Sequence, residues 1–241
     1  MPLKLHILSD LHIETGGFVL PESDADVLVL AGNVGRGAGG LVWLRHQGFT
    51  KPVIYVPGPY ELCGQGLAVL AELKESAPPG VHVLVSDSVV SAGVRFIGAM
   101  VWTDAGQLNA PECFFSPSGS SPVLFDPLLM QELGILTPQD AVRLHHQSRE
   151  RLVSLLSQPF SGKTLVITTH ALVSANQRPL YTNHRPNRTF IRQFDPLVKQ
   201  TQPALWIHGG VAEEIDMKVA GSRIVSRPVN QKEGLTKLFN V

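Results

Sequence analysis

The chain has 241 residues, of which 44% are hydrophobic and 17% are charged, and its formal net charge at pH 7 is zero. This hydrophobic content predicts a folded globular protein and argues against a disordered one. A net charge of zero gives no overall electric field that would attract nucleic acid or an anionic membrane surface, so neither partner is expected.

The length, chain start and cysteine content predict one cytoplasmic domain. A chain of this length can bury one large hydrophobic core, and we expect a single domain over residues 1–241. A strand-like pattern begins directly after Met1 and Pro2, so no secretory signal peptide is expected. No apolar run is long enough to cross a bilayer. The two cysteines, Cys63 and Cys113, are too few for a disulfide framework and are expected to be reduced thiols.

Short runs of apolar and β-branched residues recur along the chain, and several end at a polar or glycine-containing turn. Runs of this length and composition are typical of buried strands. We predict strands over residues 4–9, 26–30, 52–56, 81–85, 94–102, 164–168 and 204–207. Residues 217–225 are predicted to form a hairpin that turns at Gly221 and Ser222.

Amphipathic helical patterns lie between several of these strands, over residues 41–47, 66–76 and 138–156. The third is the clearest, because Thr137 is an N-cap candidate, Pro138 stands at the first helical position and Asp140 adds an early negative charge. Strands that alternate with helices early, and a hairpin late, predict an α/β protein with helices covering a mixed sheet. Residues 107–136 and 171–187 fit neither period and are expected to be lids or binding loops, or else surface segments.

Candidate functional residues follow five of the predicted strands. The motifs are Asp10-Leu11-His12, Gly32-Asn33, Gly58-Pro59-Tyr60-Glu61, Thr169-His170 and His208-Gly209-Gly210-Val211-Ala212. Their order and spacing resemble those of the calcineurin-like metallophosphoesterases, which read Asp-x-His, Gly-Asp, Gly-Asn-His-Asp/Glu, a lone His and Gly-His-x-His. The resemblance covers nearly the whole chain. It implies a four-layer αββα sandwich with two mixed β-sheets and a site at the C-terminal ends of the strands.

The family chemistry requires two divalent cations that hold the phosphate and activate a hydroxide, with one carboxylate bridging the metals. By resemblance, Asp10 and His12 match ligands of the first metal, and His170 matches a ligand of the second. The other positions differ: the bridging aspartate is Asn33, the ligand asparagine is Pro59, the catalytic histidine is Tyr60, and the last two histidine ligands are Gly210 and Ala212. A stable divalent site needs three or four protein ligands. We therefore expect neither a dinuclear metal centre nor another cofactor.

The remaining polar groups are expected to meet in one cleft, where they can transfer protons without a metal. The predicted catalytic residues are Asp10, His12, Tyr60 and His170. The predicted substrate contacts are Asn33, His208, Tyr181, His184, Arg185 and Arg188, and the arginines suit a carboxylate or a phosphate. Structural interpretations stand beside these roles: Asp10 as a turn cap, Tyr60 as a filler of the space left by a histidine and a metal, and His208 as an internal residue. Glu61 matches the family pattern and is expected to support the fold.

Three functions remain open on the sequence. The leading hypothesis is a metal-independent acid–base enzyme of the cyclase, lyase or hydrolase type, acting in specialised metabolism on a small organic molecule, which the arginines suggest is anionic. The second is a non-catalytic protein that uses the same cleft to bind a ligand or partner. The third is a residual phosphoesterase with one weakly bound metal at Asp10, His12 and Asn33. The sequence identifies neither the substrate nor the oligomeric state.

Overall fold

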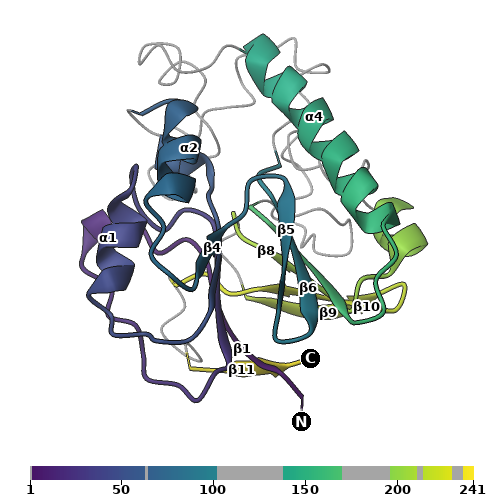
Figure 1. The fold of residues 1–241 in the computed structure, drawn as a ribbon, viewed down its shortest axis with the longest axis horizontal. Coiled ribbons are helices and arrows are strands. Elements are labelled where there is room, and N and C mark those ends of the chain that lie inside the picture. Colours follow the sequence, from purple (N-terminus) through teal and green to yellow (C-terminus); the bar gives the residue numbers. More distant parts are fainter. Residues whose placement is uncertain (1, 63–64, 102–137, 170–195, 211–213, 230–235) are drawn as a thin grey trace.

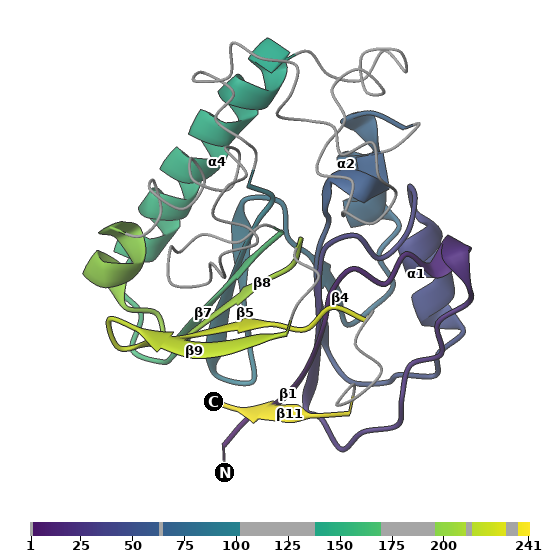
Figure 2. The same ribbon diagram turned by 180° about the vertical axis from the view of Figure 1, so that it is seen from behind.

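The computed structural model describes residues 2–62, 65–101, 138–169, 196–210, 214–229 and 236–241. In this part of the chain, two mixed β-sheets lie between helices, with α1 and α2 on one side of the molecule and α4 on the other (Figure 1). Seen from behind, the same arrangement places strand β11 beside β1, so that the two chain ends lie close together (Figure 2).

Within the described residues, the first sheet has five strands in the order β11-β1-β2-β3-β4. The four strands β1 (Lys4–Leu8), β2 (Val27–Ala31), β3 (Val53–Val56) and β4 (Val81–Val83) run parallel. Strand β11 (Leu238–Asn240) pairs antiparallel with β1. All residues of β2 and β3 are buried, as expected for strands that are covered on both faces.

The second sheet has six described strands in the order β5-β6-β7-β8-β10-β9. Its four inner strands, β6 (Val94–Ala99), β7 (Thr164–Thr168), β8 (Leu205–His208) and β10 (Ser222–Ser226), run parallel. The edge strands β5 (Asp87–Ser91) and β9 (Ile215–Val219) pair antiparallel with their neighbours. Parallel inner strands bring the ends of β7 and β8 to one edge of this sheet.

The described helices are α1 (Gly39–Arg45), α2 (Ala68–Glu75) and α4 (Pro138–Ser157), together with a helical segment over residues 196–201. Two short 3-10 helices, η1 (Ile13–Thr15) and η2 (Pro59–Leu62), follow the first and third strands. No helix in the described ranges combines the length and apolar character needed to cross a membrane.

Three clusters of buried apolar side chains fill the spaces between neighbouring layers. Alternate residues of β2 enter two of them: Leu28 and Leu30 pack with the side chains of α1 and α2, whereas Val29 packs with Phe96 of the second sheet. The third cluster packs α4 against the outer face of the second sheet and includes Trp206. The period-two alternation of strand side chains therefore produces the layer order αββα. The predicted α/β fold, a four-layer sandwich with two mixed β-sheets, is confirmed.

Several predicted elements need correction. Strands β5 and β11 were not predicted, because β5 alternates buried and exposed residues at a sheet edge and β11 is only three residues long. The hairpin runs from residue 215 to 226 and turns at Ala220 and Gly221, which both have positive φ, so Ser222 already belongs to β10. The predicted strands over 81–85 and 94–102 end earlier, at Val83 and Ala99.

The helix predicted over 138–156 matches α4 to within one residue. The expected N-cap Thr137 lies outside the described residues, as do Cys63, Cys113 and both irregular segments.

Replacement of Phe96 tests the interface between the two sheets. This side chain is fully buried in the cluster that joins them. Phe96→Ala should lower the free energy of unfolding by about 3–5 kcal/mol, because it removes apolar contacts and leaves a cavity. Val90→Ala on the adjacent edge strand is the control, since Val90 is 56% exposed. The control should cost less than about 1 kcal/mol by denaturant titration, and equal losses in both variants would contradict this packing.

Candidate functional site

The motifs that follow the first three strands meet at one edge of the first sheet. Asp10 follows β1, Asn33 follows β2 and Tyr60 lies in η2 after β3. Because β1, β2 and β3 are parallel neighbours, their C-terminal ends lie together. The side-chain amide of Asn33 donates to Oδ1 of Asp10 at 2.8 Å, and its Oδ1 accepts the backbone N–H of Tyr60 at 3.2 Å. One amide thus connects all three strand ends.

The second sheet reaches the same place. The backbone N–H of Gly210, two residues after β8, donates to Oδ1 of Asp10 at 3.2 Å and to Oδ2 at 3.1 Å. The side chain of Thr169, which directly follows β7, packs against Gly32 of the second motif. Residues that follow strands of both sheets therefore lie close to Asp10.

Glu61 fixes the backbone that follows β2 and β3. Its buried carboxylate accepts four hydrogen bonds, from the N–H groups of Gly58 (2.7 Å), Val34 (2.8 Å) and Asn33 (3.2 Å) and from the Tyr55 hydroxyl (2.8 Å). Gly58 is required here, because a Cβ at this position would lie 2.5 Å from the Asn33 Oδ1. Glu61 therefore supports the fold, as expected, and it does so by fixing the backbone of Asn33.

Burial raises the pKa of Glu61 to about 7, although the hydrogen bonds from Tyr55, Val34 and Gly58 favour the ionised form and limit the rise. Burial also raises the pKa of the Tyr55 hydroxyl well above its usual value, and the Glu61 carboxylate adds to this effect. Tyr55 therefore keeps its proton near neutral pH and donates a hydrogen bond to Glu61.

Three site residues have a strained backbone. Asp10, His12 and Asn33 have φ angles of 55°, 43° and 56°, in the left-handed region. Such a conformation costs on the order of 1–3 kcal/mol for a residue other than glycine, and it is tolerated best by Asp, Asn and His. Backbone hydrogen bonds maintain it, since Asp10 N–H donates to Gly32 O at 3.0 Å and His12 N–H donates to Asn33 O at 3.1 Å. Strain of this kind concentrates at functional sites.

Tyr60 lies at the rim of the site between an imidazole and a guanidinium. The ring of His12 meets it edge-on at 4.4 Å between centroids, and Cζ of Arg36 lies 5.5 Å from its centroid. The pKa of the Tyr60 hydroxyl is raised, first by burial and then by Glu14, whereas Arg36 opposes the rise. Tyr60 is therefore a proton donor rather than a phenolate near neutral pH.

Sequence reasoning missed Glu14 and Arg36. Each lies two or three residues beyond a motif residue, His12 or Asn33. Their position shortly after predicted strands could have identified them as site residues, because residues at such positions lie at the same sheet edge as the motifs.

The environment of Asp10 makes it less acidic than an ordinary aspartate. Burial raises its pKa, while the hydrogen bonds from Asn33 and Gly210 and the charge of His12 act in the opposite direction. A carboxylate with a raised pKa takes up a proton more readily, which suits a general base.

His208 is packed inside the protein and is 1% exposed. Burial lowers its pKa to about 4, so the ring is neutral at pH 7. Its Nδ1 lies 3.2 Å from the carbonyl oxygen of Gly209, which assigns the ring proton to Nδ1. The predicted contact of His208 with a substrate stays a prediction. The other predicted site residues, His170, Tyr181, His184, Arg185 and Arg188, lie outside the described residues.

The described donors do not fit the dinuclear metal centre that the family resemblance implies. Asn33 turns an N–H toward Asp10, and an amide nitrogen is not a metal ligand. A flipped amide would place N–H against the N–H of Tyr60 and oxygen against a carboxylate, so its neighbours fix its orientation. Both Asp10 oxygens accept N–H donors. Over the described ranges, no three His, Cys, Asp or Glu side chains are grouped to hold a metal ion.

Known proteins resemble this chain in structure rather than in sequence. No protein-family model and no curated protein matches it. A phosphopantetheinyl hydrolase from Mycobacterium tuberculosis is similar in fold, with a TM-score of 0.68 and 18% identity over 100% of this chain and 96% of that chain. A Staphylococcus aureus protein assigned as a 5'-nucleotidase, solved with alpha-ketoglutarate, has a TM-score of 0.52 and 10% identity over 94% of this chain and 48% of that chain. These likenesses show a fold shared with a hydrolase and a nucleotidase.

The raised pKa of Glu61 predicts a pH-dependent stability. Because the folded pKa of about 7 exceeds the ordinary value of 4.5, the contribution of Glu61 is fully present below about pH 4.5 and is lost as the pH rises through 7. The loss should be about 3 kcal/mol. We expect the difference in free energy of unfolding between the wild type and Glu61→Gln to decrease by this amount from pH 4.5 to 8. A difference that does not change with pH would contradict it. If the Gln variant does not fold, Tyr55→Phe should move the same decline to higher pH.

Replacement of Asn33 by aspartate tests the amide link. Asn33→Asp puts two carboxylates within hydrogen-bond distance, so in the presence of a chelator at pH 8 it should lower the free energy of unfolding by about 2–4 kcal/mol. The loss should be smaller at pH 5, where the pair shares a proton. Asn33→Ala is the control, because it removes the hydrogen bonds without adding charge, and its loss should change less between pH 5 and pH 8 than that of the Asp variant. An Asp variant as stable as the wild type at pH 8 would be inconsistent with this geometry.

Proposed function

We propose that this chain uses the residues around Asp10 and Tyr60 as an acid–base site that works without a dinuclear metal centre, on a small organic molecule with an anionic group. One observation carries the proposal: Asn33, at the position of the bridging carboxylate by resemblance, donates an N–H to Asp10 at 2.8 Å. The amide supplies the link between strand ends that a cation supplies when both residues are carboxylates. The reaction is of the cyclase, lyase or hydrolase type.

Each described group has a role that follows from its surroundings. Asp10 is the general base, because its raised pKa allows it to accept a proton. Tyr60 is the donor, because its raised pKa keeps the hydroxyl protonated. His12 contacts the Tyr60 ring and positions it. His170 is proposed as a further catalytic group from the end of β7.

Arg36 is the described residue best placed to hold the anionic group of a substrate. It is exposed, and its guanidinium lies over the ring of Tyr60 at the rim of the site. A guanidinium stacked on an aromatic ring still directs N–H donors outward, and these donors match a carboxylate or a phosphate. The predicted contacts Asn33, His208, Tyr181, His184, Arg185 and Arg188 belong to the same proposal.

Metal-dependent phosphoesterase activity and simple ligand binding are the outcomes that would replace this proposal. The likeness to a phosphopantetheinyl hydrolase, at 18% identity, makes phosphoesters the necessary comparison substrates. A suitable panel contains carboxylate esters, lactones, dicarboxylates, phosphomonoesters and phosphodiesters, each assayed with EDTA and with added Mn²⁺. We expect turnover of an organic anion that EDTA leaves unchanged. Turnover of phosphoesters alone, dependent on Mn²⁺, would identify a residual phosphoesterase. Saturable binding of an organic anion without turnover would identify a binding protein.

Substitutions then assign the roles within the pocket. Asp10→Asn, Tyr60→Phe and His170→Ala should each lower kcat by about 10²–10⁴-fold, because each removes a proton-transfer group. Arg36→Met should raise KM by about tenfold or more and change kcat little, because it removes a binding interaction that is equal in ground and transition states. Arg45→Met is its matched control, since this exposed arginine at the end of α1 bonds only to the Ser76 carbonyl oxygen among the contacts described, and its kinetics should not change. Equal effects of the two arginine substitutions would remove Arg36 from the site.

A further inference from the structure

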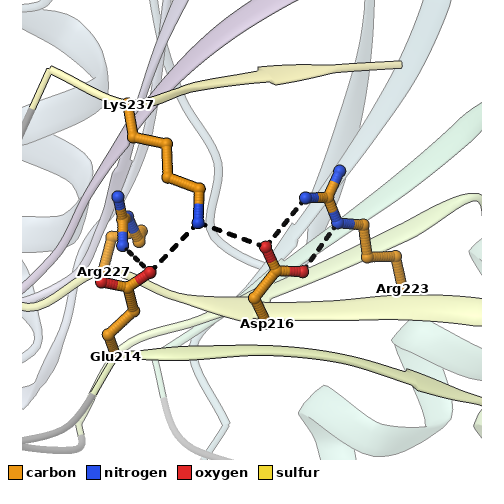
Figure 3. Close-up of polar contacts among 5 residues, drawn as sticks. All are labelled: Glu214, Asp216, Arg223, Arg227 and Lys237. Carbon is orange, nitrogen blue, oxygen red and sulfur yellow. Dashed lines mark hydrogen bonds and ion pairs between the residues drawn. The ribbon is translucent and has the colours of Figure 1, made fainter. Parts of the chain in front are cut away.

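Three cations beside the hairpin of β9 and β10 each pair with a carboxylate (Figure 3). Arg223 donates two hydrogen bonds of 2.8 Å to Asp216, and both Arg227 and Lys237 pair with Glu214. Arg227 is the most buried of the three cations, since its side chain is only 5% exposed. A carboxylate partner of this kind offsets the cost of removing a positive charge from water.

Arg95 of β6 is also buried, at 9% exposed, but it has no carboxylate partner among the described residues. Its Nε donates to the Thr164 hydroxyl at 3.1 Å, and its Nη1 donates to the Gln158 carbonyl oxygen at 2.7 Å. The ring of Phe160 lies near the guanidinium, with its centroid 5.1 Å from Cζ. Burial lowers the pKa of Arg95, and no described carboxylate opposes this shift. The contacts of this cation are therefore with neutral groups.

A role in helix capping accounts for part of this arrangement. Gln158 directly follows α4, so the hydrogen bond from Nη1 of Arg95 reaches one of the carbonyl groups that the helix leaves without an internal partner. The C-terminal end of a helix carries a partial negative charge, equivalent to about half an elementary charge. This partial charge offsets only part of the positive charge of the guanidinium, and the rest remains available to an external anion.

Arg95 keeps N–H donors that such an anion can reach. Its Nη2 donates to no acceptor in the described part of the chain. The buried side-chain atoms without a hydrogen-bond partner, over the same residues, are the hydroxyl oxygens of Ser9, Ser222 and Ser226, so Nη2 is not buried and can meet solvent. Lys163 adds a second positive charge nearby, because its carbonyl oxygen accepts the backbone N–H of Arg95 at 2.9 Å. Its side chain is exposed and forms no ion pair with a described carboxylate.

We propose that Arg95 and Lys163 form a binding site for a small oxyanion, a phosphate group or a carboxylate, at the edge of the second sheet where β6 and β7 begin. Arg95 is the second residue of β6, and Thr164, its partner in register, is the first residue of β7. The residues near Asp10 follow the C-terminal ends of β7 and β8 instead, so the two sites lie at opposite edges of this sheet. A planar guanidinium presents N–H donors in a geometry that matches both anions. The inference does not depend on the proposed function.

An NMR titration of the isotopically labelled protein with sodium phosphate tests this site, with NaCl used to keep the ionic strength constant. The Nε–H resonance of Arg95 and the amide resonances of Lys163 and Thr164 should shift and then saturate. A parallel titration with sodium acetate distinguishes the two anionic groups, because the anion that saturates at the lower concentration is the preferred one. Arg95→Met should weaken binding by about tenfold or more, because it removes the charged donor. Lys163→Met should weaken binding by a smaller factor, because this charge is exposed.

Arg223→Met is the matched control, because it also removes an arginine from the second sheet, but one that already binds Asp216. This control should bind the anion as the wild type does. Arg95→Lys keeps the test available if Arg95→Met does not fold, and its affinity should be several-fold below that of the wild type, because lysine retains the charge without the planar donors. Shifts that saturate with neither anion, unchanged affinity in the Arg95 variants, or an equal loss in Arg223→Met would overturn the inference. Absence of turnover at Asp10 would remove the proposed function and leave this result unaffected.

Discussion

The hydrogen bond from the Asn33 amide to the Asp10 carboxylate, 2.8 Å long, joins the ends of β1 and β2 at the candidate site. Its geometry depends on both ends of the amide, because the Asn33 oxygen accepts the backbone N–H of Tyr60. It also depends on Glu61, whose carboxylate holds the N–H groups of Asn33 and Val34. Two carboxylates at these strand ends would repel each other and need a cation between them. One carboxylate and one amide attract each other without it.

The carboxylates of Asp10 and Glu61 are stabilised by N–H and O–H donors of the protein, and this environment changes their pKa values. Backbone and amide dipoles offset only part of the cost of burial, so the pKa of Glu61 rises to about 7 and that of Asp10 is also raised. Carboxylates that bind a metal ion would instead have lowered pKa values, because a nearby cation favours their ionised form. The same interactions that hold the strand ends therefore leave Asp10 able to exchange a proton.

The sequence was sufficient for the layers and for the convergence of the motifs, because both follow from local rules. Buried runs predict strands, and parallel neighbouring strands place their C-terminal ends at one edge. It was insufficient for contacts that depend on three-dimensional orientation. The direction of the Asn33 amide, the donation of Asn33 and Val34 N–H groups to Glu61 and the burial of His208 depend on neighbours that are distant in the chain. The roles of His170, Tyr181, His184, Arg185 and Arg188 remain predictions.

Anomalous diffraction from crystals grown with Mn²⁺ would show both whether a cation binds between Asp10 and Asn33 and how the Asn33 side chain is oriented. We predict no anomalous peak between Asp10 and Asn33, with the amide nitrogen of Asn33 still within hydrogen-bond distance of Asp10 Oδ1. A strong peak at that position, with the Asp10 carboxylate turned toward it and the Asn33 oxygen as a ligand, would contradict the account.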